Sequence, residues 1–284
     1  MQHIHRAFAL LILAAPLAVP QAPSGQAPSA GQPGTTRVGA PEQAVPRTSR
    51  RRRPPDRFAG QERIRALLIS GGCCHDYRGQ DKILMDLMAD VLPVDWTILY
   101  EGGQSSDARV ALYNKPNWAE GFDVVIHNEC FANVADEKFI RQITSVHKAG
   151  MPAMVIHCTM HSYRAATIDD WREFVGVTTR RHTRRHNIAV KVADRDSSLT
   201  ESIPSDWTTP IDELYVVEKV WPTSTVLATA VSPEEGNAVY PVIWTNDFHG
   251  ARVFGTTLGH SETFDDPVFR DLLIRAFKWT VKRE

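Results

Sequence analysis

From residue 63 onward, short apolar runs alternate with stretches in which apolar residues recur every three or four positions. The apolar runs predict buried strands and the amphipathic stretches predict helices. Strands are expected at 64–70, 95–100, 121–128 and 153–157, and helices at 80–92, 136–149 and 167–175. This order is typical of a doubly wound, mostly parallel sheet that carries helices on both faces.

The C-terminal half follows a different pattern, in which strand-like segments succeed one another without helices between them. Strands are expected at 186–194, 213–218, 225–230, 240–245 and 252–257. The last two flank a segment rich in Asn, Asp and Gly, which predicts a β-hairpin. An amphipathic helix at 267–282 closes the chain. We therefore expect additional antiparallel β elements beside the parallel sheet.

The N-terminal region has the layout of an export signal rather than of a folded domain. A weakly cationic start is followed by the apolar run 7–19 and by small residues, so we expect a signal peptide at 1–22. Residues 23–59 are rich in Pro, Gly and Ala and predict a disordered linker. The folded domain is expected at 60–284. The apolar run is short for a bilayer, so we expect an exported protein without an integral membrane span.

The amino-acid composition argues against nucleic acid as a partner. Hydrophobic residues make up 43% and charged residues 23% of the 284 positions, as in ordinary globular proteins. The net charge of -1 supplies no basic field for nucleic acid. Four cysteines are present, at positions 73, 74, 130 and 158. Disulfides in an exported chain and reactive or buried thiols both remain open, whereas the absence of a CxxC pair argues against a zinc ribbon.

Candidate chemistry follows the ends of the predicted strands. In an open α/β sheet, ligands bind beyond the carboxyl ends of the strands, so these loops should converge. Their polar residues are His75, Asp76 and Tyr77, then Asn128 and Glu129, then His157, Cys158, His161 and Arg164, and finally His260 and Glu262. Imidazoles with carboxylates can pass protons or bind a divalent metal. We assign catalysis to His157, His75, Asp76, His260 and Glu262. The candidate metal ligands are His157, His75 and His260.

The remaining strand-end residues are candidates for substrate binding, together with three residues from later segments. His182 lies in the arginine-rich stretch 180–186, which fits either a solvated loop or a lid over an oxygen-rich substrate. Glu213 and Tyr215 begin a later strand and could contact substrate hydroxyls. The substrate-binding set is Tyr77, Asn128, Glu129, His161, Arg164, His182, Glu213 and Tyr215.

These segments resemble the ThuA-like (trehalose utilisation) family. The resemblance is carried by residues 71–77, 124–131, 155–164, 212–215, 241–245 and 252–260. It implies a flavodoxin-like sheet of the class I glutamine amidotransferase type. In that wider fold a nucleophilic Cys occupies the elbow after a central strand, with a later His-x-Glu. Here His157 takes the elbow, Cys158 follows it, and His260–Glu262 resembles the His-x-Glu. Many relatives also have a His-Pro motif where this chain reads Arg195 to Leu199.

The resemblance implies carbohydrate metabolism, centred on trehalose, related disaccharides and their keto forms. We therefore expect an exported hydrolase or lyase with a small-molecule carbohydrate substrate and a His/carboxylate site that works with or without a divalent metal. One alternative is an amidase or hydrolase in which Cys158 attacks, His260 is the base and Glu262 orients it. Another alternative is a sugar-binding module without catalysis.

Overall fold

The structure, a computed structural model, describes residues 57–283. The expected signal peptide and nearly all of the expected linker lie outside the described residues. Within residues 57–283, no helix combines the length and the apolar character that crossing a membrane requires.

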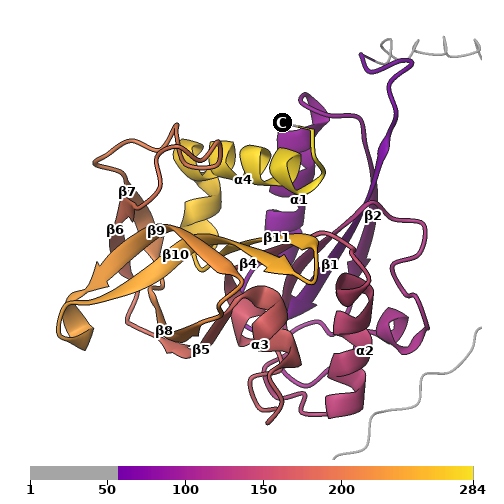
Figure 1. The fold of residues 1–284 in the computed structure, drawn as a ribbon, viewed down its shortest axis with the longest axis horizontal. Coiled ribbons are helices and arrows are strands. Elements are labelled where there is room, and N and C mark those ends of the chain that lie inside the picture. Colours follow the sequence, from indigo (N-terminus) through magenta and orange to yellow (C-terminus); the bar gives the residue numbers. More distant parts are fainter. Residues whose placement is uncertain (1–56, 284) are drawn as a thin grey trace, which may run out of the picture. The chain divides into compact units, whose positions relative to one another are not determined.

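A nine-stranded sheet in the order β2-β1-β3-β4-β11-β10-β9-β6-β7 forms the centre of the fold (Figure 1). Its first five strands are parallel to one another. They are β2 (Val94–Tyr100), β1 (Ile64–Gly72), β3 (Val124–Cys130), β4 (Ala153–Ile156) and β11 (Ala251–Thr256). The order 2-1-3-4 followed by a fifth parallel strand is that of flavodoxin-like proteins, so the predicted fold class is confirmed.

Four antiparallel strands extend the sheet beyond β11. They are β10 (Ala238–Phe248), β9 (Ser224–Ser232), β6 (His186–Val192) and β7 (Thr208–Asp212). β10 and β11 form the predicted hairpin. Its turn is tighter than expected, because only His249 and Gly250 separate the strands, and both have positive φ values, 54° and 89°. Paired positive φ values are typical of a type I′ turn, whose twist matches that of the flanking strands.

Helices cover both faces of the sheet. α1 (Tyr77–Ala89) and α4 (Pro267–Thr280) pack on the face that buries Leu68, whereas α2 (Glu137–Lys148) and α3 (Asp170–Val175) pack on the face that buries Leu67. Successive β1 side chains thus enter opposite cores, as strand geometry requires. Aspartates 76, 136 and 266 accept backbone amides at the N-termini of α1, α2 and α4 and fix where these helices begin.

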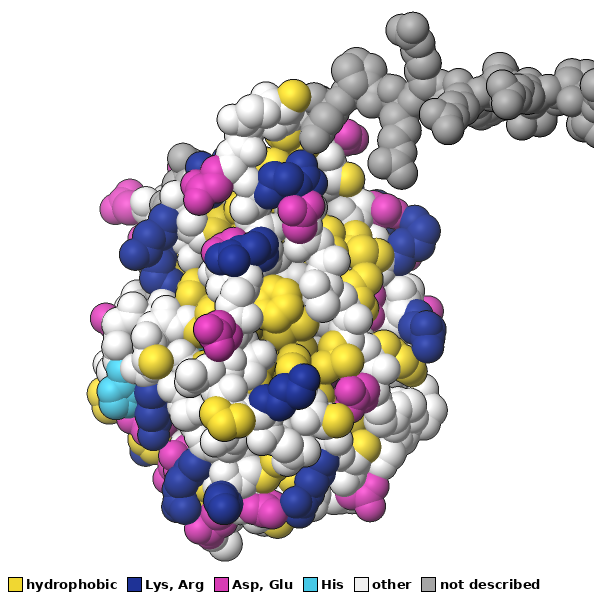
Figure 2. All heavy atoms as spheres, turned by 90° about the vertical axis from the view of Figure 1, so that its right-hand side faces the viewer, with side chains coloured by type: hydrophobic (Ala, Val, Ile, Leu, Met, Phe, Trp, Pro, Cys, Tyr) yellow, Lys and Arg dark blue, Asp and Glu magenta, His cyan; other side chains and the backbone are white. Residues whose placement is uncertain are grey.

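The edge strand β2 carries a single charged side chain, Asp95, which pairs with Arg63. Figure 2 faces this side of the molecule and shows apolar side chains interspersed with Lys, Arg, Asp and Glu. Ile98, for example, is 42% exposed. Charged side chains along an exposed edge discourage pairing with another strand.

The sequence prediction missed two strands and a small second sheet. β5 (Val177–His182) pairs antiparallel with β8 (Tyr215–Val220) outside the main sheet. The first half of the arginine-rich stretch is therefore a strand and not a loop. Its buried positions precede the arginines, in the run Val177 to Thr179, so the charges that follow concealed the pattern. The prediction also missed β7. β8 begins at Tyr215, two residues after the predicted start of this strand at 213.

A polar network is buried in the core on the α2 face. His127 Nε2 lies 3.1 Å from His147 Nε2, and the Tyr113 hydroxyl donates to Glu129 at 2.7 Å. All four side chains are fully buried. His147 Nδ1 faces the Met151 carbonyl oxygen at 2.8 Å. Burial holds the pKa of His147 well below its ordinary value, with the neighbouring His127 acting in the same direction.

This depressed pKa predicts a pH-dependent stability. Below pH ~6.5 the unfolded chain protonates His147 and the folded chain does not, so the free energy of unfolding should fall as the pH falls. A single such histidine contributes a slope of up to ~1.4 kcal/mol per pH unit. We expect urea unfolding between pH 6.5 and 5 to show a slope smaller by about that amount in His147→Gln. Exposed His249→Gln is the control, and equal slopes in all three proteins would contradict the assignment.

Candidate functional site

Four histidines meet beyond the carboxyl ends of the parallel strands. His75 follows β1, and His157 opens the 3₁₀ helix η2 (His157–His161) after β4. His260 follows β11 and precedes η4 (Ser261–Asp265), and His182 ends β5. The ring centroids of His75 lie 4.6 Å from His157 and 5.2 Å from His260. This set is called the imidazole cluster below.

Glu213, between β7 and β8, lies at the centre of the imidazole cluster. Its carboxylate oxygens stand 3.5 Å from His157 Nε2, 3.6 Å from His182 Nε2 and 3.9 Å from His260 Nε2. Only His182 is substantially exposed, with 39% of its side chain accessible. The structure thus joins residues from five separate segments of the sequence at one carboxylate.

His157 occupies a strained elbow. Its φ of 49° lies in the left-handed region, which non-glycine residues rarely adopt. Nδ1 of His157 lies 2.6 Å from the carbonyl oxygen of Thr257, and a carbonyl can only accept, so Nδ1 carries the proton. The lone pair of the neutral ring is therefore on Nε2, which faces Glu213.

His260 is oriented in the same way. Its Nδ1 donates to the carboxylate of Glu262 at 3.0 Å, which leaves Nε2 directed at Glu213. His182 Nδ1 donates to the Thr183 carbonyl at 2.8 Å, again with Nε2 toward Glu213. The structure brings His260 and Glu262 together as the sequence predicted. Proteins usually orient a metal-binding or catalytic imidazole by placing a hydrogen-bond acceptor against one of its ring nitrogens.

Asp212 supports the site from beneath, and sequence reasoning did not select it. Its fully buried carboxylate accepts the amides of Gly259 and His260 at 3.0 and 3.2 Å and the hydroxyl of Thr263 at 2.7 Å. It also accepts the amide of Glu213 at 2.7 Å. One side chain therefore positions the segment that carries His260 against the one that carries Glu213. The adjacent acidic pair in the sequence was the available signal.

The surroundings shift the pKa values of the site residues in different directions. Burial lowers the pKa of His75 to about 3, and the neighbouring His157 and His260 add to this. Burial raises the pKa of Glu213, but His157 and the other imidazoles more than offset it and bring the value to about 2. Burial likewise lowers the pKa of His157, yet Glu213 and Asp212 outweigh it and leave the pKa raised.

Several buried polar atoms at the site have no hydrogen-bond partner within the described chain: His75 Nδ1, His157 Nε2 and the Tyr215 hydroxyl. Buried polar groups are nearly always paired, so these atoms are available to bind a ligand. One donor atom each from His75, His157 and Glu213 lie within 4.8 Å of one another. Two imidazoles in their neutral form and a carboxylate are a donor set that suits Zn²⁺ and related divalent metals.

A stack of rings forms one wall beside the imidazole cluster. The His161 ring lies parallel to the Tyr215 ring at 4.2 Å and 6°, and the His182 ring lies against both, 5.6 Å from Tyr215 and 6.0 Å from His161. Burial lowers the pKa of His161 to about 2, with Arg164 acting in the same direction. Arg164 is tied to β5 by a bond from Nη1 to the Arg180 carbonyl at 2.7 Å. His161, Arg164 and Tyr215 thus belong to the surroundings of the site.

Four predicted site residues have structural partners instead. Asp76 caps α1 through the amide of Gly79, and no hydrogen bond in the described chain joins it to His75, so the expected acid/base pair is absent. Tyr77 donates to the Cys73 carbonyl at 3.0 Å. Asn128 donates to Gln80 at 3.1 Å, and Glu129 belongs to the buried Tyr113 network. The alternation of β3 explains Glu129, because its side chain enters the α2 core.

Cys158 does not join the imidazole cluster. It forms a disulfide with Cys130, and Cys73 is bonded to Cys74, so the described chain contains no free cysteine. The Cys158 thiol that the amidase alternative requires is therefore absent from this structure. The arginines of the expected lid are also engaged, since Arg181 forms a two-pronged ion pair with Glu235 at 2.6 and 2.8 Å.

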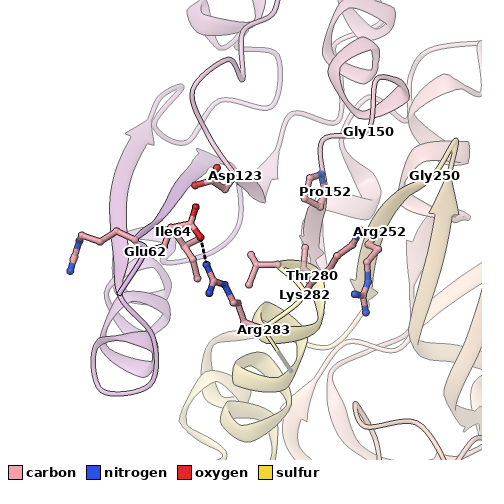
Figure 3. A pocket seen from close by; sticks show the side chains of 12 residues that line it. Glu62, Ile64, Asp123, Gly150, Pro152, Gly250, Arg252, Thr280, Lys282 and Arg283 are labelled. Carbon is pink, nitrogen blue, oxygen red and sulfur yellow. Dashed lines mark hydrogen bonds and ion pairs between the residues drawn. The ribbon is translucent and has the colours of Figure 1, made fainter. Parts of the chain in front are cut away.

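A hollow at the opposite edge of the sheet is separate from this site. It is lined by residues at the amino ends of β1, β3 and β4 and at the C-terminal end of α4, among them Ile64, Asp123 and Pro152 (Figure 3). An ion pair between Arg283 and Glu62 at 2.7 Å crosses it. Ligands of open α/β sheets bind at the carboxyl edge, where the imidazole cluster lies.

Comparisons with known proteins agree with this fold. A family model described as "ThuA: Trehalose utilisation" matches residues 88–280. A ThuA-like protein from Parabacteroides merdae matches with a TM-score of 0.63 and 17% identity over 78% of this chain and 90% of that one. A second, from Bacteroides uniformis, matches with a TM-score of 0.62 and 16% identity over 81% and 96%.

A cold-adapted β-galactosidase from Rahnella sp. R3 has a TM-score of 0.50 and 12% identity over 78% of this chain and 32% of that one. At these identities the structural matches report the fold alone. Among curated proteins, the search finds no match.

The role of Asp212 can be tested by removing its carboxylate. Asp212→Ala leaves buried donors of four residues without their acceptor, and we expect it to lower the free energy of unfolding by about 3 kcal/mol. Hydrogen exchange should accelerate at the amides of Gly259 and His260. Exposed Asp206→Ala is the control, with an expected change within about 0.5 kcal/mol. Wild-type exchange at both amides in Asp212→Ala would refute the role.

Proposed function

Since the chain belongs to the ThuA (trehalose utilisation) family, we propose that it is an exported carbohydrate-active enzyme. It acts as a hydrolase or lyase on a disaccharide or keto-sugar derivative. The reaction takes place at the imidazole cluster around Glu213, with the help of a divalent metal.

The observation that carries this proposal is the arrangement of nitrogen lone pairs around one carboxylate. The Nδ1–H groups of His157, His260 and His182 donate away from the centre, so the Nε2 lone pairs of the neutral rings all face Glu213. With all three rings neutral, these lone pairs and the carboxylate within 4 Å would repel one another, and for this reason the pKa of His157 is raised and that of Glu213 is lowered to about 2. A cation held between them, or a proton on one nitrogen, removes this repulsion and gives the buried carboxylate its counter-charge.

The donor set favours the metal. His75, His157 and Glu213 would hold it, and His260 would stand beside them as a fourth donor. The carbonyl of Thr257 and the carboxylate of Glu262 would fix the two rings in the metal-binding tautomer. A bound divalent cation supplies Lewis acidity, which polarises a hydroxyl or carbonyl oxygen of a sugar.

The groups around the centre suit a polar, hydroxyl-rich substrate. The Tyr215 hydroxyl is buried without a partner, so it can donate to or accept from a sugar hydroxyl. The exposed side chain of His182 marks the side from which a substrate would reach the site. A keto-sugar or disaccharide offers many hydroxyls and at least one oxygen that a cation or an acid can activate.

Export rests on two independent features. The N-terminal sequence has the layout of a signal peptide, and the described chain carries two disulfides. Disulfides persist in oxidising compartments and are rare in the cytosol of most organisms. Both features support a location outside the cytoplasm.

Metal content provides the first test. We expect elemental mass spectrometry of the purified full chain to find close to one divalent metal per chain, and His157→Ala and Glu213→Gln to lose it. The control is His249→Ala, a histidine exposed on the β10–β11 turn, which should retain the metal. Retention of metal in both site variants would contradict the assigned ligands.

Turnover provides the second test. Trehalose, other disaccharides and their keto derivatives would be incubated with wild type and His157→Ala, and sugars would be followed by mass spectrometry. We expect a product from at least one of them, and a rate at least ~10²-fold lower in His157→Ala. Binding of a sugar without any product would favour the sugar-binding module, and full activity in His157→Ala would rule out the catalytic assignment.

A further inference from the structure

The strand register brings the four cysteines of this chain together. Gly72 at the end of β1 pairs with Cys130 at the end of β3, and Cys73 follows directly. β3 also pairs with β4, with His127 opposite Val155. Cys130 lies three residues after His127, and Cys158 lies three residues after Val155. The parallel pairing of β1, β3 and β4 therefore gathers these sulfurs at one edge of the sheet.

Glycine at position 72 permits the close approach. A Cβ atom there would lie 2.3 Å from the carbonyl oxygen of Cys130, and its φ of 96° is unfavourable for other residues. The chain consequently turns tightly over the end of β3. The Cys73–Cys74 disulfide thus stands against the Cys130–Cys158 disulfide, with 4.0 Å between Cys73 Sγ and Cys130 Sγ.

The solvent exposure of the four cysteines decreases from the Cys73–Cys74 disulfide to the Cys130–Cys158 disulfide. Cys74 is exposed and Cys73 is partly buried, whereas Cys130 and Cys158 are 2% and 7% exposed. A reductant in solution can therefore reach the Cys73–Cys74 disulfide directly and has little access to the inner one. Thiol–disulfide exchange depends on such access and on the approach of one sulfur to another.

We propose that Cys73 and Cys74 are the entry site of a thiol–disulfide exchange relay that carries reducing equivalents from an external dithiol to the buried Cys130–Cys158 disulfide. The external dithiol first reduces the Cys73–Cys74 disulfide and is itself oxidised to a disulfide. The Cys73 thiolate then attacks Cys130 Sγ, the bond between Cys130 and Cys158 breaks, and Cys158 leaves as a thiolate that takes up a proton.

The relay closes in a second exchange. The Cys74 thiolate attacks Cys73 in the new Cys73–Cys130 bond, which re-forms the Cys73–Cys74 disulfide and releases Cys130. The net result is one oxidised external dithiol and one reduced Cys130–Cys158 pair, so electrons and protons balance. This chemistry is independent of the reaction proposed for sugars.

The fold can tolerate the opening of the inner disulfide. η2 is also held on β3 by the Thr159 hydroxyl, which donates to the His127 carbonyl at 2.8 Å, and by the Ser162 hydroxyl, which donates to the Glu129 carbonyl at 2.9 Å. The exchange therefore needs no unfolding. Since Cys158 directly follows His157, the relay ends beside the elbow of the imidazole cluster.

A pair of single variants tests the relay without any added reductant. In Cys74→Ser the free Cys73 thiol should attack Cys130, so that alkylation followed by peptide mapping finds label on Cys158 and a Cys73–Cys130 link. In the matched Cys73→Ser, the free thiol should stay on Cys74. Label confined to Cys73 in a Cys74→Ser protein with wild-type circular dichroism would overturn the relay.

A kinetic test uses the natural sequence. The full chain would be exposed to dithiothreitol under native conditions, quenched with an alkylating agent and mapped over time. We expect label on Cys130 and Cys158 to appear at least ten-fold faster in wild type than in Cys73→Ser/Cys74→Ser. Equal rates in the two proteins, or a wild-type inner disulfide that stays intact while the outer one opens, would refute the proposal.

Discussion

The buried carboxylate of Asp212 is the interaction on which the candidate site depends. It stands at the end of β7, at the far edge of the sheet, yet it accepts hydrogen bonds from the segment after β11. A carboxyl group with two acceptor oxygens satisfies these amides and the Thr263 hydroxyl together. The antiparallel extension of the sheet is thereby folded back over the carboxyl ends of the parallel strands. Asp212 thereby helps to fix the position of Glu213 among the imidazoles.

The parallel half of the fold was predictable from sequence because its signals are local. Each strand is an apolar run and each helix has one apolar face, so β1, α1, β3, α2 and β4 were found close to their observed bounds. The order of these elements also indicated the carboxyl edge as the site. The structure places His75, His157 and His260 at that edge, since each follows the end of a parallel strand within four residues.

The remainder depends on contacts that sequence spacing does not encode. Asp76 and Glu129 stand at strand ends like the true members of the site, but one caps a helix and the other faces the core. Glu213 was among the candidates and Asp212 was not; apart from their being adjacent acids, nothing local in the antiparallel half indicates that they reach the other strand ends. Arginines concealed β5, because its alternation is short and its buried positions are mostly threonines. Whether a residue joined the site depended on which face of a strand it occupies or whether it caps a helix, and not on its residue type.

At the elbow after β4, two adjacent side chains point in opposite directions and take part in different chemistry. His157 turns toward Glu213 while Cys158, its neighbour, turns toward Cys130 at the end of β3. Related folds use this elbow to present a nucleophile; here the left-handed backbone of His157 presents an imidazole, and the sulfur is sequestered on the other side. The two sides are joined through the backbone between residues 157 and 158 and between residues 74 and 75. A change in the sulfur partners would therefore act on the imidazole through the most strained point of the site, with the Thr257 carbonyl holding the ring in place.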